Sequence, residues 1–157
     1  MASQVRRVVT GHDANGRAVV TIDEQVDLNA GRPGIAARVL WTTEAFPVDN
    51  TGDSDAATRE TGTTLANGTV FRIVQFGPGS APRVHRTDSI DYAVVLSGEI
   101  DMELDDEVVH LTAGDTLVQR GTIHNWVNNG TEPCTIAFIL IDAQPVTVGG
   151  TVLNAVG

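Results

Sequence analysis

Cysteine is nearly absent from this 157-residue sequence, in which Cys134, inside an apolar run, is the only one. A single cysteine cannot form an internal disulfide, and it excludes a zinc site built from several thiolates. The simplest interpretation of Cys134 is a small buried hydrophobic residue. A chain of this length forms one domain, and its core is large enough to need no disulfide.

Long hydrophobic runs are also missing, because no stretch approaches the roughly 18 apolar residues of a membrane-spanning helix. The first residues, MASQVRRVVTG, contain two arginines but no apolar region of the kind that a signal peptide carries. We therefore expect a cytoplasmic protein that has no membrane partner.

Positive charge is scarce. Ten basic residues face twenty acidic ones, which gives a formal net charge of −10 at pH 7. Such a charge repels phosphate backbones and anionic lipids. We therefore expect no nucleic-acid partner, and a small molecule becomes the expected ligand without being identified.

A helical period is absent too, and the pattern throughout is that of short strands. Turn signals recur every 8–12 residues, which is typical of an all-β sandwich or barrel. The expected strands are 5–9, 17–23, 35–43, 69–79, 91–96, 99–104, 108–111, 116–120, 123–128 and 133–143, and a further edge strand in 147–156. The stretch 91–96 is nearly all apolar and is expected to be buried on both faces.

The longest polar segment is 47–63, which is rich in acidic residues and has no apolar periodicity. We expect a loop here. A loop this long is usually functional or mobile, so it is interpreted either as a lid over a pocket or as a solvated excursion on the surface.

A first motif lies in 79–98, GSAPRVHRTDSIDYAVVLSG. It resembles the first motif of the cupin family, in which a glycine is followed by His-x-His, a glutamate and a closing glycine. Gly79, His85 and Gly98 match this pattern. Thr87 stands where the family has its second histidine, and Asp91 stands where it has the glutamate.

A second motif, GDTLVQRGTIHNWVN, follows after the 15 residues 99–113. It is similar to the second cupin motif, and Gly114, Gly121, His124 and Asn128 match it. The usual proline before Gly121 is missing. Two motifs in this order are specific for the fold.

The resemblance implies an all-β fold, the cupin double-stranded β-helix, which is a jelly-roll barrel, with extra N-terminal strands. We expect one domain with three parts: 1–68, N-terminal strands and the acidic loop packed on the barrel; 69–145, the barrel core with both motifs; and 146–157, a C-terminal tail. Cupins often pair through their sheets, and an exposed strand edge needs cover, so a homodimer is expected.

The resemblance also implies that motif residues point into one cavity, where His85, Asp91 and His124 would converge. Two imidazoles and one carboxylate are the ligand set of non-haem iron sites, and they would also hold manganese, nickel or zinc. These three residues are the predicted metal ligands and catalytic residues. Thr87 could orient a metal-bound water or contact a bound ligand.

A metal-free site remains open with the same residues. A histidine beside a carboxylate is a tunable acid–base pair, and Asp91 could hold His85 or His124 in one tautomer. The expected function is a cupin enzyme acting on a small carbonyl, enol or carboxylate compound. With a metal it would be an oxygenase, decarboxylase or isomerase, and without one an isomerase, dehydratase or lyase. A non-enzymatic small-molecule-binding protein is the further alternative.

Other polar and aromatic residues are weaker candidates for the pocket. Gln75, Gln119 and Trp126 are predicted to line it. Arginines could meet an acidic substrate, since a guanidinium suits a carboxylate, and the candidates are Arg72, Arg83 and Arg120. Tyr92 has the opposite strand parity to Asp91, so we expect a packed aromatic residue on the other face. His12 and His110 are expected to be exposed.

Overall fold

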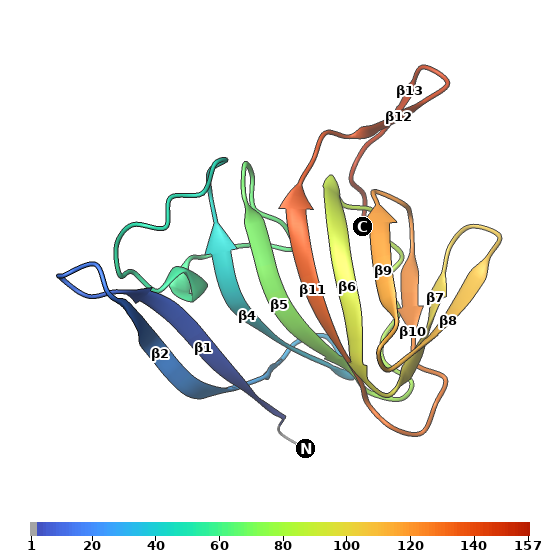
Figure 1. Ribbon diagram of the computed structural model, residues 1–157. Helices are drawn as coiled ribbons and strands as arrows, with labels where there is room; N and C mark the ends of the chain where they lie inside the picture. Colours follow the sequence, from blue (N-terminus) through green and yellow to red (C-terminus); the bar gives the residue numbers. More distant parts are fainter. Residues whose placement is uncertain (1–2) are drawn as a thin grey trace.

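The computed structural model describes residues 3–157, and nearly all of its regular structure is β (Figure 1). The strands are β1 Gln4–His12, β2 Ala18–Asp27, β3 Asn29–Ala30, β4 Ile35–Thr43, β5 Thr69–Phe76, β6 Ser89–Ser97, β7 Glu99–Glu103, β8 Val108–Thr112, β9 Thr116–Arg120, β10 Asn125–Val127, β11 Cys134–Asp142, β12 Val146–Val148 and β13 Thr151–Leu153. In the described part of the chain the one helical turn is the 3-10 helix η1, Ala56–Thr58. The all-β prediction is confirmed.

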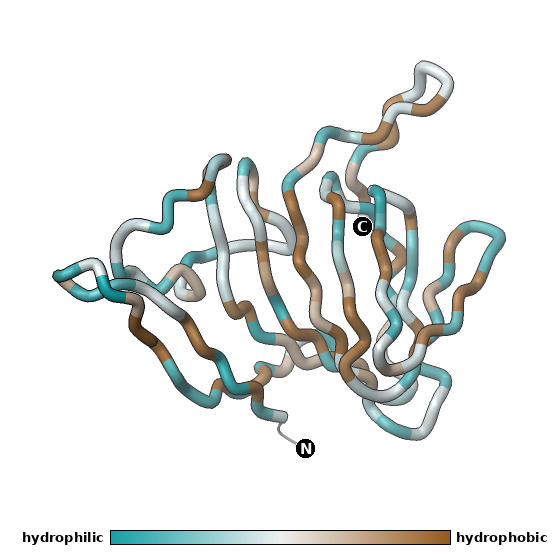
Figure 2. The backbone as a smooth tube through the Cα atoms, viewed as in Figure 1, coloured by the Kyte–Doolittle hydropathy of each residue, from teal (hydrophilic) through white to brown (hydrophobic). Residues whose placement is uncertain are grey.

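Two antiparallel sheets form the barrel. The larger has the strand order β3-β4-β5-β11-β6-β9, and the smaller has the order β10-β7-β8. Their facing side chains make one core that contains Val70, Ile136 and Phe138 from the large sheet and Ile100 and Trp126 from the small one. In Figure 2 the apolar segments follow the strands of the large sheet, and polar segments gather at the turns. This arrangement is the predicted jelly roll.

Gly98 joins the two sheets at the turn between β6 and β7. Its φ angle is +77°, and a Cβ added there would lie 2.4 Å from the carbonyl oxygen of Pro133 and 2.9 Å from Cα of Cys134. Only glycine combines this backbone conformation with so close an approach. The last glycine of the first motif is therefore a requirement of the fold.

Asn128, the last residue of the second motif, also serves the fold. Its side-chain amide donates to the carbonyl oxygens of Phe76 and Glu132, both at 2.9 Å, and its Oδ1 accepts from the backbone N–H of Gly130 at 2.9 Å. The side chain is fully buried. It closes the turn before β11 and contributes nothing to a pocket.

The N-terminal hairpin β1-β2 packs outside the barrel, against β4 and β5 (Figure 1). Val26, Leu28, Leu40 and Ile73 form a second, smaller apolar cluster there. The hairpin turns at Asn15-Gly16, where Gly16 has φ +74°, as the sequence predicts. This hairpin therefore gives β4 an apolar cover on the side that faces away from the barrel.

Arg7 connects the hairpin to the acidic segment 47–63. Only 7% of it is exposed, and its guanidinium donates to Glu24, to the carbonyl oxygen of Leu40 at 3.1 Å and to Asp55 at 2.6 and 2.8 Å. Asp55 also accepts from the N–H of Ala57 and so caps η1. We call Arg7, Glu24 and Asp55 the Arg7 network.

Two expectations for strands are corrected. The stretch 91–96 is buried on one face only, because its outer side chains Tyr92, Val94 and Leu96 are 44%, 37% and 50% exposed. Tyr92 does point away from Asp91, but it is exposed where a packed residue was expected. The tail 147–156 adds no edge strand to either sheet of the barrel, since β12 pairs with β13 as a separate hairpin.

Within residues 3–157, nothing helical has the length and apolar character of a membrane-crossing segment.

Candidate active site

A cavity of about 280 Å³ opens inside the barrel between the two sheets. One side is apolar, and the other carries the ionisable residues. The apolar lining includes Ile35, Val74, Phe76, Trp126, Phe138 and Leu140, and the ionisable lining consists of Arg32, Arg72, Arg83, His85, Asp91 and His124. The volume lies just below the usual 300–1,000 Å³ of ligand pockets. It suits a small organic molecule.

His85 and His124 meet across an isolated antiparallel bridge. The N–H of each donates to the carbonyl oxygen of the other, both at 3.0 Å. Directly opposed residues of an antiparallel pair put their side chains on the same face. The two rings accordingly lie with centroids 4.2 Å apart. The predicted convergence of the two motif histidines is thus present in the structure.

Both histidines are oriented in the same way by the backbone. Nδ1 of His85 lies 2.9 Å from the carbonyl oxygen of Arg83, and Nδ1 of His124 lies 2.9 Å from that of Thr122. In each case the partner is two residues earlier in the chain. A carbonyl accepts only from N–H, so this contact assigns the proton to Nδ1 and leaves Nε2 as the basic nitrogen.

Nε2 of His124 has a neighbour of its own. The side-chain amide nitrogen of Gln119 lies 2.9 Å from this nitrogen and 2.6 Å from Nδ1 of the same ring, and both residues are buried. Within residues 3–157, Nε2 of His85 accepts no hydrogen bond, which leaves it as the freer base of the pair.

Burial lowers the pKa of both histidines, because a charged imidazole is poorly solvated in the barrel. For His124 the pKa falls to about 4, and the nearby positive charges of His85 and Arg83 lower it further. For His85 the direction is the same, with Arg83 and Arg32 as the additional charges. Both rings are therefore neutral at pH 7, and a proton on one ring disfavours a proton on the other.

Asp91 lies on β6 and is held by a chain of hydroxyl groups. Ser89 Oγ donates to Asp91 at 2.5 Å and lies 2.8 Å from Thr87 Oγ1. Burial raises the pKa of Asp91, while the bond from Ser89 and the charge of Arg72 oppose that rise. In this structure the ionic neighbour of Asp91 is Arg72 rather than either histidine.

The predicted three-ligand metal set does not fit the structure as it stands. His85, Asp91 and His124 all line the cavity, but across residues 3–157 no three His, Cys, Asp or Glu side chains are arranged to hold one metal ion. The carboxylate of Asp91 accepts a hydrogen bond from Ser89 Oγ.

The weaker site candidates have mixed outcomes. Trp126 lines the cavity, and its ring packs edge-on against Phe138 with centroids 5.6 Å apart. Gln119 is not among the residues that line the cavity, but it contacts His124. Thr87 does not line the cavity either, and its hydroxyl lies 2.8 Å from that of Ser89.

The prediction that Gln75 lines the pocket is wrong. Along β5, Arg72, Val74 and Phe76 line the cavity, so Gln75 has the opposite parity. Its side chain bonds to Ser3 and Thr135 on the outer face of the sheet.

The arginines divide in the same manner. Arg72 and Arg83 line the cavity, which a contact with an acidic substrate requires, whereas Arg120 is exposed at the end of β9. His110 is exposed, as expected, and lies 2.7 Å from Asp101.

Sequence reasoning missed Arg32 and Asn125, which also line the cavity. Arg32 belongs to the turn GRPG between β3 and β4, a stretch that reads as an ordinary turn. Asn125 directly follows the motif histidine, and its amide accepts from the N–H of Arg83 at 2.9 Å. Its place next to His124 could have identified Asn125, because a buried side-chain amide usually has a hydrogen-bond partner.

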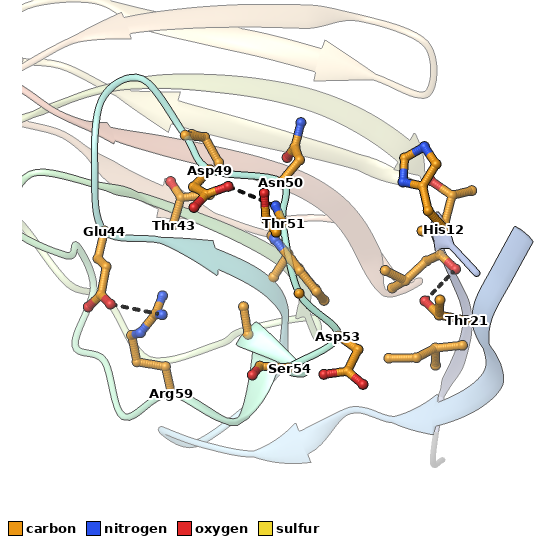
Figure 3. A pocket seen from close by; sticks show the side chains of 18 of the residues that line it. His12, Thr21, Thr43, Glu44, Asp49, Asn50, Thr51, Asp53, Ser54 and Arg59 are labelled. Atoms are coloured by element: carbon orange, nitrogen blue, oxygen red, sulfur yellow. Dashed lines mark hydrogen bonds and ion pairs between the residues drawn. The ribbon is translucent and has the colours of Figure 1, made fainter. Parts of the chain in front are cut away.

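A second cavity, about 480 Å³, lies between the hairpin and the segment 44–59 (Figure 3). Two of its acidic side chains have nearby partners: Asp49 accepts from the N–H of Thr51, and Glu44 pairs with Arg59. Neither motif histidine reaches it. The barrel cavity is therefore the candidate active site.

Comparison with known proteins agrees with the cupin resemblance and with the β fold. A family described as "Cupin domain" matches residues 72–141. The chain is 36% identical to "Cupin-domain-containing oxidoreductase fogC" of Aspergillus ruber, over 94% of this chain and 77% of that protein. It is 39% identical to "Phomopsin biosynthesis cluster protein C'" of Diaporthe leptostromiformis, over 96% of this chain and 85% of that protein.

A solved structure supports the fold. The putative ethanolamine utilization protein q from Salmonella typhimurium superposes with a TM-score of 0.54 at 12% identity, covering 90% of this chain and 99% of that one. At this identity the likeness concerns the fold alone.

Proposed function

Since this chain belongs to the cupin family, we propose that it is an enzyme whose barrel cavity moves a proton on a small carbonyl compound, with His85 as the general base. The observation that carries the proposal is the pair of neutral imidazoles. Both have Nδ1 tied to a backbone carbonyl, and both line the one cavity inside the barrel.

The chemistry follows from the protonation states. A carbon next to a carbonyl loses a proton to a neutral base, and positioned general bases contribute about 10²- to 10⁴-fold to the rate. Nε2 of His85 is such a base. The proton then returns from the imidazolium to the oxygen or to the neighbouring carbon, which moves a double bond within the molecule. One carbon is oxidised while its neighbour is reduced, so no external oxidant is needed.

His124 supports a one-proton mechanism. Its ring lies 4.2 Å from that of His85, and its pKa of about 4 keeps it neutral while His85 carries the proton. Two adjacent cations would repel each other in a low-dielectric cavity. Gln119 acts as a positioning residue, because its amide bonds to His124 and lies outside the cavity wall.

Solvent exchange tests this proposal without knowledge of the product. The protein is incubated in D₂O with a panel of carbonyl compounds that carry α-protons, and the loss of the C–H signal is followed by NMR. We expect exchange with at least one compound, and a fall of about 100-fold or more in His85→Ala. His110→Ala is the matched control, since His110 lies on an exposed face outside the cavity.

Two results would contradict the proposal. One is exchange that persists unchanged in His85→Ala. The other is saturable binding of the same compounds with no exchange by the wild-type protein, which would favour a non-enzymatic binding protein.

A metal-dependent oxidation is the second candidate, and the printed word "oxidoreductase" in the name of the Aspergillus relative favours it. The arrangement of Asp91 in this structure argues against it. Elemental analysis of protein purified without added metal separates the two candidates. A stoichiometric transition metal that is lost in both His85→Ala and His124→Ala would favour the oxidation.

A further inference from the structure

Three arginines from separate chain segments line the ionisable side of the barrel cavity. Arg32 comes from the turn before β4, Arg72 from β5, and Arg83 from the segment that leads to His85. This is an unusual concentration in a chain with a net charge of −10, in which all ten basic residues are arginine. Asp91 is the single carboxylate among the described residues that line the cavity.

These arginines have no acidic side chain at contact distance. In the described part of the chain, ion pairs form at Arg6, Arg7 and Arg59, and none forms at Arg32, Arg72 or Arg83. Carbonyl oxygens serve them instead: Arg72 donates to Gly62 at 2.6 Å, and Arg32 donates to Ala81 at 2.9 Å. Carbonyls orient a guanidinium without neutralising its charge, and Asp91 is the one carboxylate of the cavity lining that acts on Arg72.

Arg72 shows most clearly that these arginines lack partners. Its Nε–H is buried and has no hydrogen-bond partner in the described structure. A buried donor without a partner is costly, and native proteins rarely keep one without a use. Burial and the charge of Arg83 both lower the pKa of Arg72, and Arg83 lowers that of Arg32 in the same way. Arg83 therefore repels both of the other cations, and at Arg72 the charge of Asp91 opposes this repulsion.

We propose that Arg32, Arg72 and Arg83 form an oxyanion site, and that the cavity takes a small organic acid whose carboxylate or phosphate lies on these arginines. A guanidinium binds such groups through two parallel N–H···O bonds. The apolar body of the ligand would lie against Phe76, Trp126 and Phe138. This inference rests on the proposed function for its role in turnover, since it makes the carbonyl substrate an acid, but its binding test stands alone.

The first experiment compares ligands of matched shape. Benzoate, phenyl phosphate and the neutral amide benzamide are titrated into the intact protein by calorimetry at pH 7. We expect at least one anion to bind ten-fold or more tightly than benzamide. A stronger signal from benzoate assigns a carboxylate, and a stronger signal from phenyl phosphate assigns a phosphate. Equal binding of all three, or binding by benzamide alone, would overturn the proposal.

Variants locate the site. Arg72→Met and Arg83→Met should each lose most of the preference for the anion, while Arg120→Met should retain it because Arg120 lies outside the cavity. Arg72→Lys keeps the charge but not the planar donor pair, so intermediate binding is expected. An anion preference that survives both methionine variants would overturn the assignment.

Salt dependence of the wild-type protein covers the case in which a variant fails to fold. Sodium chloride should weaken anion binding and leave benzamide binding unchanged; no difference between the two would count against the site.

The oxyanion site and the proposed function can be contradicted by different results. Proton exchange that is equal for a keto acid and its methyl ester would contradict the oxyanion site alone. Arginine-dependent binding of benzoate without exchange on any compound would contradict the proposed function alone.

Discussion

Arg7 and Arg72 are both withdrawn from solvent, but their surroundings differ in one respect, the supply of carboxylates. Arg7 lies between the hairpin and β4, and both Glu24 and Asp55 contact it. Arg72 lies in the barrel cavity, where carbonyl oxygens receive its N–H groups and one N–H is left without a partner. A paired buried charge serves the fold, whereas an unpaired one is explained more readily by a ligand.

The largest effect on stability is expected at the Arg7 network. Arg7→Met would leave Asp55 without its cation partner, and breaking a largely buried pair costs about 3 kcal/mol. For a domain of this size the melting temperature should fall by about 6–12 °C. Calorimetry measures it. Arg6→Met is the control: the Arg6–Asp23 pair is solvent-exposed, and exposed pairs contribute little to stability. An equal fall in melting temperature in the two variants would show that the Arg7 network stabilises the fold no more than the exposed pair does.

The two regions should also respond to acid in different pH ranges. His124 has a pKa of 6.5 when unfolded and about 4 when folded, so the unfolded state takes up the proton first. Its contribution is present above pH 6.5 and is lost progressively as the pH falls to about 4. The hydrogen bond from Arg7, together with its charge, lowers the pKa of Asp55 from 3.8, so that carboxylate contributes to acid unfolding only below about pH 4.

Chemical denaturation of wild type and His124→Gln between pH 7 and pH 4 measures the cavity contribution. The wild type should lose stability relative to the variant over this range, by about 2 kcal/mol after allowance for partial solvation. A constant difference between the two proteins from pH 7 to pH 4 would show that His124 does not titrate as its burial predicts.

A smaller effect is expected at Arg72 in the absence of ligand. Arg72→Met removes two hydrogen bonds to carbonyl oxygens and the ionic neighbour of Asp91, but it also relieves the repulsion from Arg83 and the unpaired N–H. The net change should stay within about 1 kcal/mol, as measured by calorimetry on ligand-free protein. A loss as large as that of Arg7→Met would show that Arg72 serves the fold in the same way as Arg7.

The smallest effect on folding is expected on the outer face of the large sheet. Phe71, Ile139, Tyr92 and Val118 are register partners on β5, β11, β6 and β9, and they form an apolar row across four strands. The homodimer predicted from the sequence would cover this row. Tyr92→Glu combined with Val118→Glu should lower the mass measured by light scattering to that of one chain and leave the melting temperature nearly unchanged. A wild-type protein that is already monomeric at micromolar concentration would contradict the dimer.

The sequence predicted the fold well because alternation and turn residues are local signals. The segment 35–43 became β4 with the expected bounds, and Gly98 closed its motif as expected. The error at 91–96 has a physical cause. An unbroken apolar run is typical of a strand covered on both sides, but in this chain the outer face of β6 is uncovered.

The candidate site was only partly predictable. His85 and His124 could be paired because two motifs carry them, and strand parity placed Trp126 correctly. Arg32 could not be found, since its role depends on a turn meeting two distant strands in space. The hydroxyl chain that draws Asp91 toward Ser89 could not be found either, because the rotamer of one side chain decides it.

The single cysteine has a practical consequence. Cys134 is fully buried where β11 meets the Gly98 turn, and burial raises the pKa of its thiol to about 11. A protonated, covered thiol does not react with alkylating reagents. Labelling of the unmodified protein can proceed only when β11 parts from its neighbours. The labelling rate therefore reports how often the barrel opens at β11, and because the sequence contains no second cysteine, the signal comes from this position alone.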